Sequence, residues 1–234
     1  MLKHLAVIMD GNRRWAKKNN LYPWQGHEAG FETLQELVAF CIEQKIPYLS
    51  VYAFSLENFK RSTEEKTHLF SLLIKTACEK LGKFKEAGIR IRFVGDQTLF
   101  PESVRSSITT IEQETGALAR GPIQLDLLIL FCYGGQQELI AAAQKICSLS
   151  KAGLISESDI TQENFRKYLW TGKDIPDPSL IIRTGGAGRL SNFLLYQSAY
   201  SELYFTNTLW PDMKKNELLE AVDDFHQRKR NFGA

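Results

Sequence analysis

The chain has 234 residues, 44% of them hydrophobic and 24% charged, which is enough for one sizeable α/β core. Its net charge of +2 is too balanced to indicate binding to nucleic acid. The longest uninterrupted apolar run, Leu127 to Tyr133, is far shorter than the roughly 20 residues of a membrane-spanning helix. Met1 leads into a strand-like segment without a signal-peptide layout, so we expect a cytoplasmic protein.

Six short apolar runs predict β-strands, at residues 4–9, 48–54, 89–94, 125–132, 179–183 and 203–206. Helical periodicity lies between and after them, at residues 27–44, 63–86, 101–118, 135–150, 161–170 and 212–229. Strands that alternate with helices predict an α/β fold with a mostly parallel central sheet of about six strands, covered by helices on both faces. Because the chain has no internal repeat or long linker, residues 1–234 are expected to form a single domain.

Residues at the helix ends support two of these helices, and the cysteine spacing indicates a reducing environment. Ser62, with Glu65 three residues later, has the spacing of a capping box that opens the 63–86 helix. Pro211 predicts the start of the last helix, and basic residues near its end, at 228–230, suit the negative pole of the helix dipole. The four cysteines form no CxxC pair, which predicts reduced core thiols in a cytosolic protein.

Ligands of parallel α/β proteins bind beyond the carboxyl ends of the strands, so polar residues that follow each strand are the candidates for chemistry. Residues 10–15 (DGNRRW) follow the first strand, residues 55–61 (SLENFKR) follow the second and residues 183–192 (RTGGAGRLSN) follow the fifth, whereas Glu202 precedes the sixth. We expect these segments, which carry five arginines, to meet at one edge of the sheet.

Such a set of residues is suited to binding a diphosphate. Guanidinium groups, backbone N–H groups and a helix N-terminus bind phosphate oxygens; Gly11 lets the backbone approach closely, and a helix is expected from Asn12. Asp10 repels an anion unless a divalent cation lies between them, as Mg²⁺ does when one or two carboxylates hold it. Glu202 is expected to be the second carboxylate. Mg²⁺ and the arginines would then stabilise a departing diphosphate.

Each feature also has a purely structural interpretation. Asp10 and Arg14 have the spacing of an (i, i+4) ion pair, worth about 0.3–0.5 kcal/mol when exposed. His27 could bond locally at the start of a helix, and the apolar face of the 63–86 helix could be core instead of the wall of a lipid tunnel. The Gly186–Gly188 stretch resembles a dinucleotide fingerprint but lacks its third glycine.

The ordered motifs MDGNxRWA, GHxxG, YAFSxEN, YGG, IRTGG, RxSNFLL and AYxELYF resemble those of the cis-prenyltransferases, in particular the bacterial members. The match is collinear from about Ala6 to Phe232. The resemblance implies successive cis condensations of isopentenyl diphosphate onto an allylic diphosphate such as farnesyl diphosphate. It also implies a homodimer and an apolar tunnel for the prenyl chain, whose floor candidates are Leu49, Val51, Ile91, Leu127 and Ile129. Loose contact with the cytoplasmic membrane face is expected through the lipid product.

The resemblance further implies roles for the residues that match these motifs. Asp10 would be catalytic and would hold Mg²⁺ together with Glu202. Gly11, Asn12, Arg13, Arg14 and His27 would surround the allylic diphosphate, and Trp15 would line the path of the prenyl chain. A loop that closes over the substrates would present Ser55, Leu56, Glu57, Asn58, Phe59 and Arg61. Isopentenyl diphosphate would bind Arg183, Arg189, Leu190 and Ser191.

Physical chemistry qualifies the catalytic role of Asn58, which is often described as a proton acceptor in this family. A neutral amide is a weak base, so we expect Asn58 to orient other groups while a diphosphate oxygen takes the proton.

The chain departs from the family pattern at three places. An arginine is missing near Pro23, before the Gly-His pair; Ala187 and Gly188 replace an acid and a frequent histidine; and a terminal Arg-x-Gly appears as residues 231–233, with Asn231 in the arginine position. Arg13 stands where glycine is usual and could compensate by adding charge. Because these departures leave fewer side chains to bind diphosphate than the family pattern has, weaker substrate affinity is expected.

Two other functions are open to a chain of this pattern. One is a noncatalytic partner subunit of a prenyltransferase complex, which the retained polar residues disfavour. The other is a phosphohydrolase of the haloacid dehalogenase type, which requires an aspartate at the position of Ile8.

Overall fold

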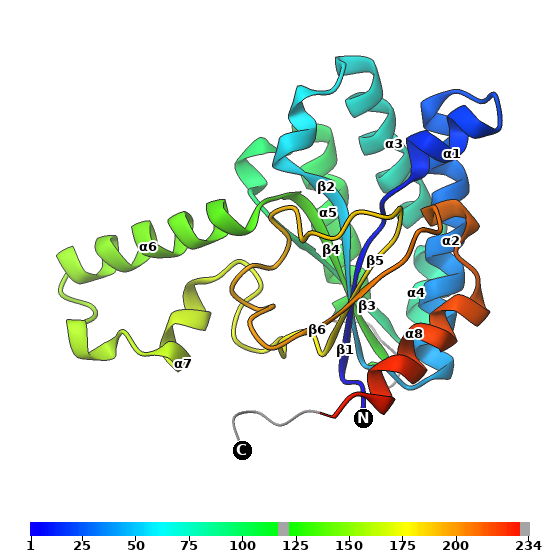
Figure 1. Cartoon of the computed structure of the whole chain (residues 1–234). Coiled ribbons are helices and arrows are strands. Elements are labelled where there is room, and N and C mark those ends of the chain that lie inside the picture. Colours follow the sequence, from blue (N-terminus) through cyan, green and yellow to red (C-terminus); the bar gives the residue numbers. More distant parts are fainter. Residues whose placement is uncertain (117–121, 230–234) are drawn as a thin grey trace.

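Six parallel strands form one sheet in the order β3-β4-β2-β1-β5-β6 in this computed structural model, which describes residues 1–116 and 122–229 (Figure 1). The strands are β1 (His4–Ile8), β2 (Tyr48–Ser55), β3 (Ile89–Val94), β4 (Leu125–Tyr133), β5 (Leu180–Arg183) and β6 (Glu202–Phe205). Every predicted strand is confirmed to within one residue at each end. The mostly parallel α/β sheet is confirmed as well.

Eight α-helices are described, and most were predicted. They are α1 (Asn12–Lys18), α2 (Pro23–Glu43), α3 (Thr63–Glu79), α4 (Leu81–Glu86), α5 (Glu102–Gly116), α6 (Gly135–Lys151), α7 (Gln162–Phe165) and α8 (Lys215–Gln227). Two 3₁₀ turns matter for the site, η1 (Leu56–Lys60) and η5 (Trp210–Asp212). None of the helices in the described ranges is long and apolar enough to cross a bilayer.

Helix α2 begins at Pro23 and not at residue 27, and three other helix assignments differ from the prediction for local reasons. The 63–86 segment is interrupted at Lys80, whose ψ of 5° leaves the helical range and separates α3 from α4. In the 161–170 segment only α7 is helical, followed by a 3₁₀ turn. The last helix starts at Lys215 and not at Pro211, because Lys214 is extended and its N–H donates to the Glu217 carboxylate at 3.0 Å.

The two faces of the sheet are covered differently. Helices α2, α3, α5 and α8 contribute to one large apolar cluster on one face, which contains Phe70, Ile111 and Phe225. On the other face, irregular segments supply Ile175 and Phe193 to a smaller cluster, while α6 projects away from the sheet (Figure 1). Irregular segments thus supply part of the cover of the second face. Both clusters hold the strand ends rigidly in place.

The cysteines differ from the expectation. Cys41 and Cys132 are buried, but Cys78 and Cys147 are exposed, so only two of the four belong to the core. Exposed positions on α3 and α6 explain the difference, because the outer side of each helix faces solvent.

Candidate active site

Asp10 lies just beyond β1, where two guanidinium groups hold its carboxylate. Arg14 donates from Nη2 to Oδ1 at 3.1 Å, and Arg183, at the end of β5, donates from Nη2 to Oδ2 at 3.0 Å. Arg14 also donates from Nη1 to the Gly185 carbonyl at 2.7 Å. The segments after β1 and β5 therefore meet at one edge of the sheet, as the sequence predicted. The (i, i+4) ion pair of Asp10 with Arg14 forms as well.

Arg183 is the buried centre of the polar cluster after β5. Only 5% of its side chain is exposed, and its Nη1 donates to Ser191 Oγ at 2.7 Å and to the Arg189 carbonyl. Arg189 donates from Nε to the same hydroxyl at 3.2 Å. Within the described chain, Arg183 Nε is buried without a hydrogen-bond partner. An oxygen of a bound anion would satisfy this donor.

Gly11 connects β1 to α1 with a φ of 121°, which other residues rarely adopt. A Cβ at this position would lie 2.9 Å from the Leu209 Cα atom. The glycine thus allows the chain before η5 to pass close to the end of β1, where Trp210 N donates to the Asp10 carbonyl at 3.0 Å. Packing of backbone against backbone, and not only space for a phosphate, explains this glycine.

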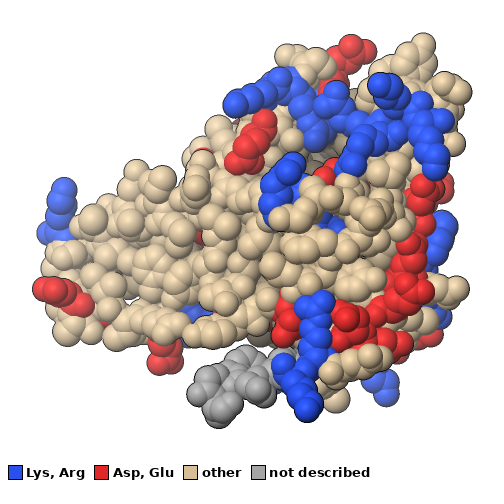
Figure 2. Space-filling model, in the orientation of Figure 1, with Lys and Arg blue, Asp and Glu red and all other residues tan. Residues whose placement is uncertain are grey.

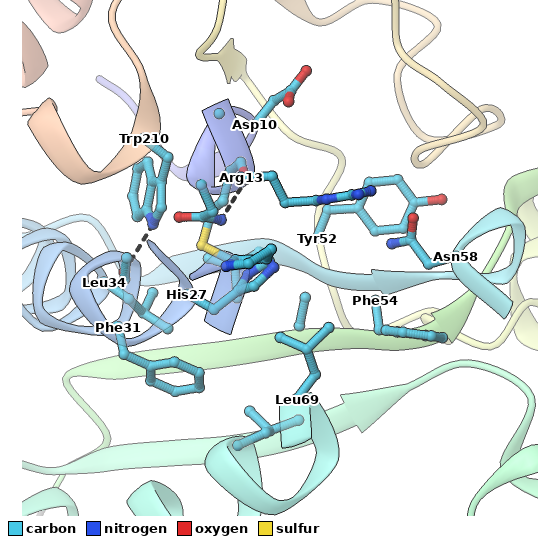
Figure 3. Close-up of a pocket in the computed structure, with 18 of the residues that line it drawn as sticks. Asp10, Arg13, His27, Phe31, Leu34, Tyr52, Phe54, Asn58, Leu69 and Trp210 are labelled. Carbon is cyan, nitrogen blue, oxygen red and sulfur yellow. Dashed lines mark hydrogen bonds between the residues drawn. The ribbon is translucent and has the colours of Figure 1, made fainter. Parts of the chain in front are cut away.

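A cavity of about 890 Å³ opens beside Asp10 and extends between α2, α3 and the sheet (Figure 3). Asp10, Arg13, His27 and Asn58 lie toward one side of it. Many of the other lining side chains are apolar: Phe31, Leu34, Val51, Ala53, Phe54, Leu69, Leu73, Ile129 and Phe131. A cavity with charge at one side and hydrocarbon elsewhere suits an amphiphile with an anionic head.

A second, smaller cavity of about 490 Å³ adjoins the first. Its lining is mostly polar: Ile8, Met9, Asp10, Tyr52, Ser55, Glu57, Asn58, Arg61, Arg183, Ser191 and Asn192. Met9, Asp10, Tyr52, Asn58 and Arg61 line both cavities. Two ligands bound side by side would therefore face each other across these shared residues.

Basic side chains gather around a hollow at the end of the molecule where α1 lies (Figure 2). Arg13, Arg14 and Lys17 of α1 line the larger cavity there. The cavity mouth is thus positively charged, which favours the approach of an anionic ligand.

The segment after β2 positions the shared residues. Arg61 donates from Nη2 to Asn58 Oδ1 at 2.9 Å, and Asn192 donates from Nδ2 to Glu57 Oε1 at 2.9 Å, which joins η1 to the chain after β5. Phe59 packs edge-on against Phe54 at 5.2 Å between ring centroids. Phe59 therefore anchors η1 to the core and is not one of the described residues that line the cavities.

His27 lies in the larger cavity with 12% of its side chain exposed. Burial, reinforced by the Arg61 and Arg13 guanidinium groups, lowers the pKa of His27 from 6.5 to about 4. Its Nε2 lies 3.8 Å from Glu65 Oε1, but the lowered pKa means that the ring is neutral near pH 7 and forms no ion pair. We favour the neutral ring because Glu65 already pairs with Arg61 at 3.0 Å.

Trp15, Leu56 and Leu190 were also expected at the site, but they are not among the described residues that line the cavities. Trp15 donates its indole N–H to Asp212 at 2.7 Å, so it ties α1 to η5 and does not line the path of a prenyl chain, contrary to the prediction. Leu190 packs against the smaller apolar cluster, and Leu56 packs against the larger one. Both leucine side chains thus pack against the apolar clusters and do not line the cavities.

The predicted pairing of Glu202 with Asp10 is wrong within one chain. Glu202 begins β6 and lies opposite Leu180, whereas Arg183 at the other end of β5 lies opposite Ile8. Parallel strands put the first residue of β6 at the amino edge of the sheet, away from the site. There the Glu202 carboxylate accepts a hydrogen bond from Arg228 at 2.8 Å.

The described residues around Asp10 do not by themselves form a complete site for a magnesium ion. Among the described residues, no group of three or more His, Cys, Asp or Glu side chains could hold a metal, and Asp10 is the carboxylate nearest the Arg183 clamp. Mg²⁺ is commonly held by one or two carboxylates together with substrate phosphates and water. Asp10 is compatible with a cation that arrives with a diphosphate.

Some residues of the site were not foreseen from sequence. Glu65, noted only as a capping residue, contacts Arg61, Arg13 and His27. Ser62 Oγ accepts from the Glu65 backbone N–H at 3.2 Å, so half of the predicted capping box is confirmed, while the Glu65 side chain turns to the site. Tyr52, inside the YAFSxEN motif, lines both cavities, and only its period-2 position relative to other strand residues could have indicated this.

The residues predicted to form the tunnel floor, and those that depart from the family pattern, lie as follows. Val51 and Ile129 line the larger cavity, whereas the other floor candidates, Leu49, Ile91 and Leu127, are buried in the core. The apolar face of α3 is therefore both core and cavity wall. Pro23 lines the cavity where an arginine was expected. Asn231 lies outside the described residues.

Comparisons with known proteins agree with this geometry. A family model described as "Putative undecaprenyl diphosphate synthase" matches residues 8–233. An isoprenyl transferase of Thermotoga maritima is 41% identical over 99% of this chain and 96% of its own length. A Pyrococcus furiosus protein named tritrans,polycis-undecaprenyl-diphosphate synthase (geranylgeranyl-diphosphate specific) is 42% identical over 99% of this chain and 86% of its own.

Two solved structures share the fold. Lavandulyl diphosphate synthase from Lavandula x intermedia, in complex with dimethylallyl diphosphate, superposes with a TM-score of 0.92 at 29% identity, over 100% of this chain and 98% of its own. A probable undecaprenyl diphosphate synthase of Campylobacter jejuni gives 0.80 at 35% identity, over 100% and 99%. With the family model matching almost the whole sequence, this chain belongs to the cis-prenyltransferase family, that of the undecaprenyl diphosphate synthases.

Proposed function

We propose that this chain, as a single catalytic domain over residues 1–234, is a Mg²⁺-dependent transferase that condenses isopentenyl diphosphate with an allylic diphosphate in successive cis additions. The product would be a polyprenyl diphosphate, in the first instance the undecaprenyl carrier-lipid precursor used in cell-wall synthesis. The enzyme would act in the cytoplasm as a homodimer, with peripheral contact to the inner membrane face through its lipid product.

The observation that carries this proposal is the pair of adjoining cavities that share Asp10 and Asn58. The larger cavity, with its apolar lining, suits an allylic diphosphate and its growing chain. The smaller polar one, beside Arg183 and Ser191, suits isopentenyl diphosphate, which has only a five-carbon tail. Side-by-side binding puts the two reacting carbons near the shared wall, and such positioning supplies much of the rate enhancement of a bimolecular reaction.

Each addition breaks the allylic C–O bond, forms a carbon–carbon bond to isopentenyl diphosphate and releases a proton and a diphosphate. Arg13, Gly11 and Asn12 would hold the departing diphosphate, and Arg183 with Arg189 would hold the one that stays. Mg²⁺, when bound at Asp10, supplies positive charge for the developing anion. The apolar lining excludes water from the allylic cation.

Asn58 fits an orienting role. Its amide oxygen already accepts a hydrogen bond from Arg61, which leaves the NH₂ group for the cavities. A diphosphate oxygen is then the better base. Asn58→Ala is expected to lower kcat by about 10²–10³-fold without abolishing product, since a positioned hydrogen-bond donor contributes on that scale. Complete loss with unchanged substrate binding would instead favour direct proton transfer.

The test is chain-length analysis of the product that the purified chain makes from isopentenyl diphosphate and farnesyl diphosphate with Mg²⁺. Geranylgeranyl diphosphate should be compared as primer, because a relative of this chain is named for it. Asp10→Ala should remove activity. No product from the wild-type chain, with product restored by a second subunit, would support the alternative of a noncatalytic partner subunit.

A further inference from the structure

Glu65, in the first turn of α3, lies among cationic groups at the edge of the larger cavity. Arg61 Nη1 donates to its Oε1 at 3.0 Å, and Arg13 Nε lies 3.9 Å from the same oxygen. The His27 ring is 3.8 Å away. Only 15% of the Glu65 side chain is exposed, so this carboxylate is poorly screened by water.

The Arg61 guanidinium is held at both ends. One nitrogen donates to Glu65 and the other donates to Asn58 Oδ1 at 2.9 Å. Because a guanidinium is planar and rigid, fixing it at Glu65 also fixes the direction of the Asn58 amide. Glu65 thus reaches the wall between the two cavities without contacting a ligand itself.

The same contacts compete with a ligand. Arg13, Arg61 and His27 line the larger cavity, but Glu65 is not among the described residues that do. A diphosphate that enters the cavity would bind the guanidinium groups of Arg13 and Arg61, but Glu65 already holds Arg61 by a hydrogen bond and lies 3.9 Å from Arg13 Nε. Glu65 also repels an anion directly. The carboxylate therefore weakens diphosphate binding while it orders the residues that the reaction uses.

We propose that Glu65 is a positioning residue, a built-in counter-ion that holds Arg61 and Asn58 in place and lowers the affinity for the allylic diphosphate and for released diphosphate. This inference rests on the proposed function. The Glu65 carboxylate would then lower the affinity for diphosphate and raise the rate of the reaction. A residue that only stabilises the fold would not produce that combination.

Glu65→Gln removes the charge and keeps the side-chain size and the backbone cap, because Ser62 bonds to the Glu65 backbone N–H. Glu64→Gln is the matched control, since Glu64 is exposed in the same first turn and loses the same charge at the helix terminus. Calorimetric titration with inorganic diphosphate, in the presence of Mg²⁺, compares the two variants with the wild-type chain.

Glu65→Gln is expected to bind inorganic diphosphate about tenfold more tightly, the order expected for one unit charge a few ångströms from a multiply charged anion in a wet site. Glu64→Gln should match the wild type. In turnover, Glu65→Gln should lower the KM for the allylic diphosphate and lower kcat by about tenfold, because Asn58 is less well oriented.

The outcomes separate the two claims. Equal diphosphate affinity in wild-type chain and Glu65→Gln overturns the inference about Glu65, and so does a weaker affinity accompanied by a lower melting temperature. If the wild-type chain binds diphosphate but makes no polyprenyl product, the proposed function fails, while the effect of Glu65 on binding is still measured.

Discussion

His27 gives a quantitative test of the electrostatics of the site. Its pKa is lowered from 6.5 to about 4 because the ring is buried next to Arg61 and Arg13. The folded pKa lies below the unfolded one, so the unfolded chain takes up the proton first as the pH falls. Stability is full above pH 6.5, is lost as the pH falls through the window between 6.5 and 4, and the loss levels off below about pH 4.

The magnitude follows from the two pKa values. Each unit of difference corresponds to about 1.4 kcal/mol, so the full loss is about 3 kcal/mol and the part between pH 7 and pH 5 is about 2 kcal/mol. His27→Gln, which does not titrate, should lose about 2 kcal/mol less over that interval than the wild-type chain. Urea unfolding at the two pH values, without ligands, measures the difference.

His4 provides the matched control, because burial also lowers its pKa to about 4. Its Nδ1 donates to the Pro176 carbonyl at 2.7 Å and its Nε2 bonds to the Ser50 hydroxyl at 2.9 Å, far from the cavities. His4→Gln should remove a similar share of the pH dependence. If His27→Gln keeps the whole wild-type pH dependence, His27 is not a buried neutral ring and the assignment of the cavity charges is wrong.

Three further outcomes are expected. Gly30→Ala should destabilise the chain by about 1–3 kcal/mol, because a Cβ there would lie 2.3 Å from Asn12 Oδ1 and 2.8 Å from the Trp210 ring. Gly82→Ala in α4 has open space around it and should stabilise the chain by about 0.5–1 kcal/mol. Thermal and urea unfolding compare the two variants. Val51→Phe should shorten the product, since Val51 lines the larger cavity, and chromatography of the polyprenols would show no shift if the chain grows elsewhere. Trp15→Phe should lower the free energy of unfolding by about 1 kcal/mol, because the hydrogen bond to Asp212 is lost, and should leave the product length unchanged. A changed product length would show that Trp15 does line the path of the prenyl chain.

The sequence alone determined the strands and the edge at which the site lies. Alternation of apolar runs with helical periodicity is a local property, so β1 to β6 could be located to within a residue. The rule that ligands lie beyond the carboxyl ends of parallel strands then brought Asp10 and Arg183 together, although they lie 173 positions apart in the chain. Long, collinear motifs indicated the family.

Only the tertiary structure decided how individual side chains are used. Glu202 and Arg228 pair at the amino edge because strand register, which no local pattern encodes, sets the level of β6 in the sheet. Trp15 turns to Asp212, which lies 197 positions away in the chain. The Glu65 side chain leaves its cap for Arg61, four residues earlier, at a place where tertiary packing also brings Arg13 and His27 close to it. Hydrogen bonds and burial between distant segments are properties of packing, so spacing in the chain could not reveal them.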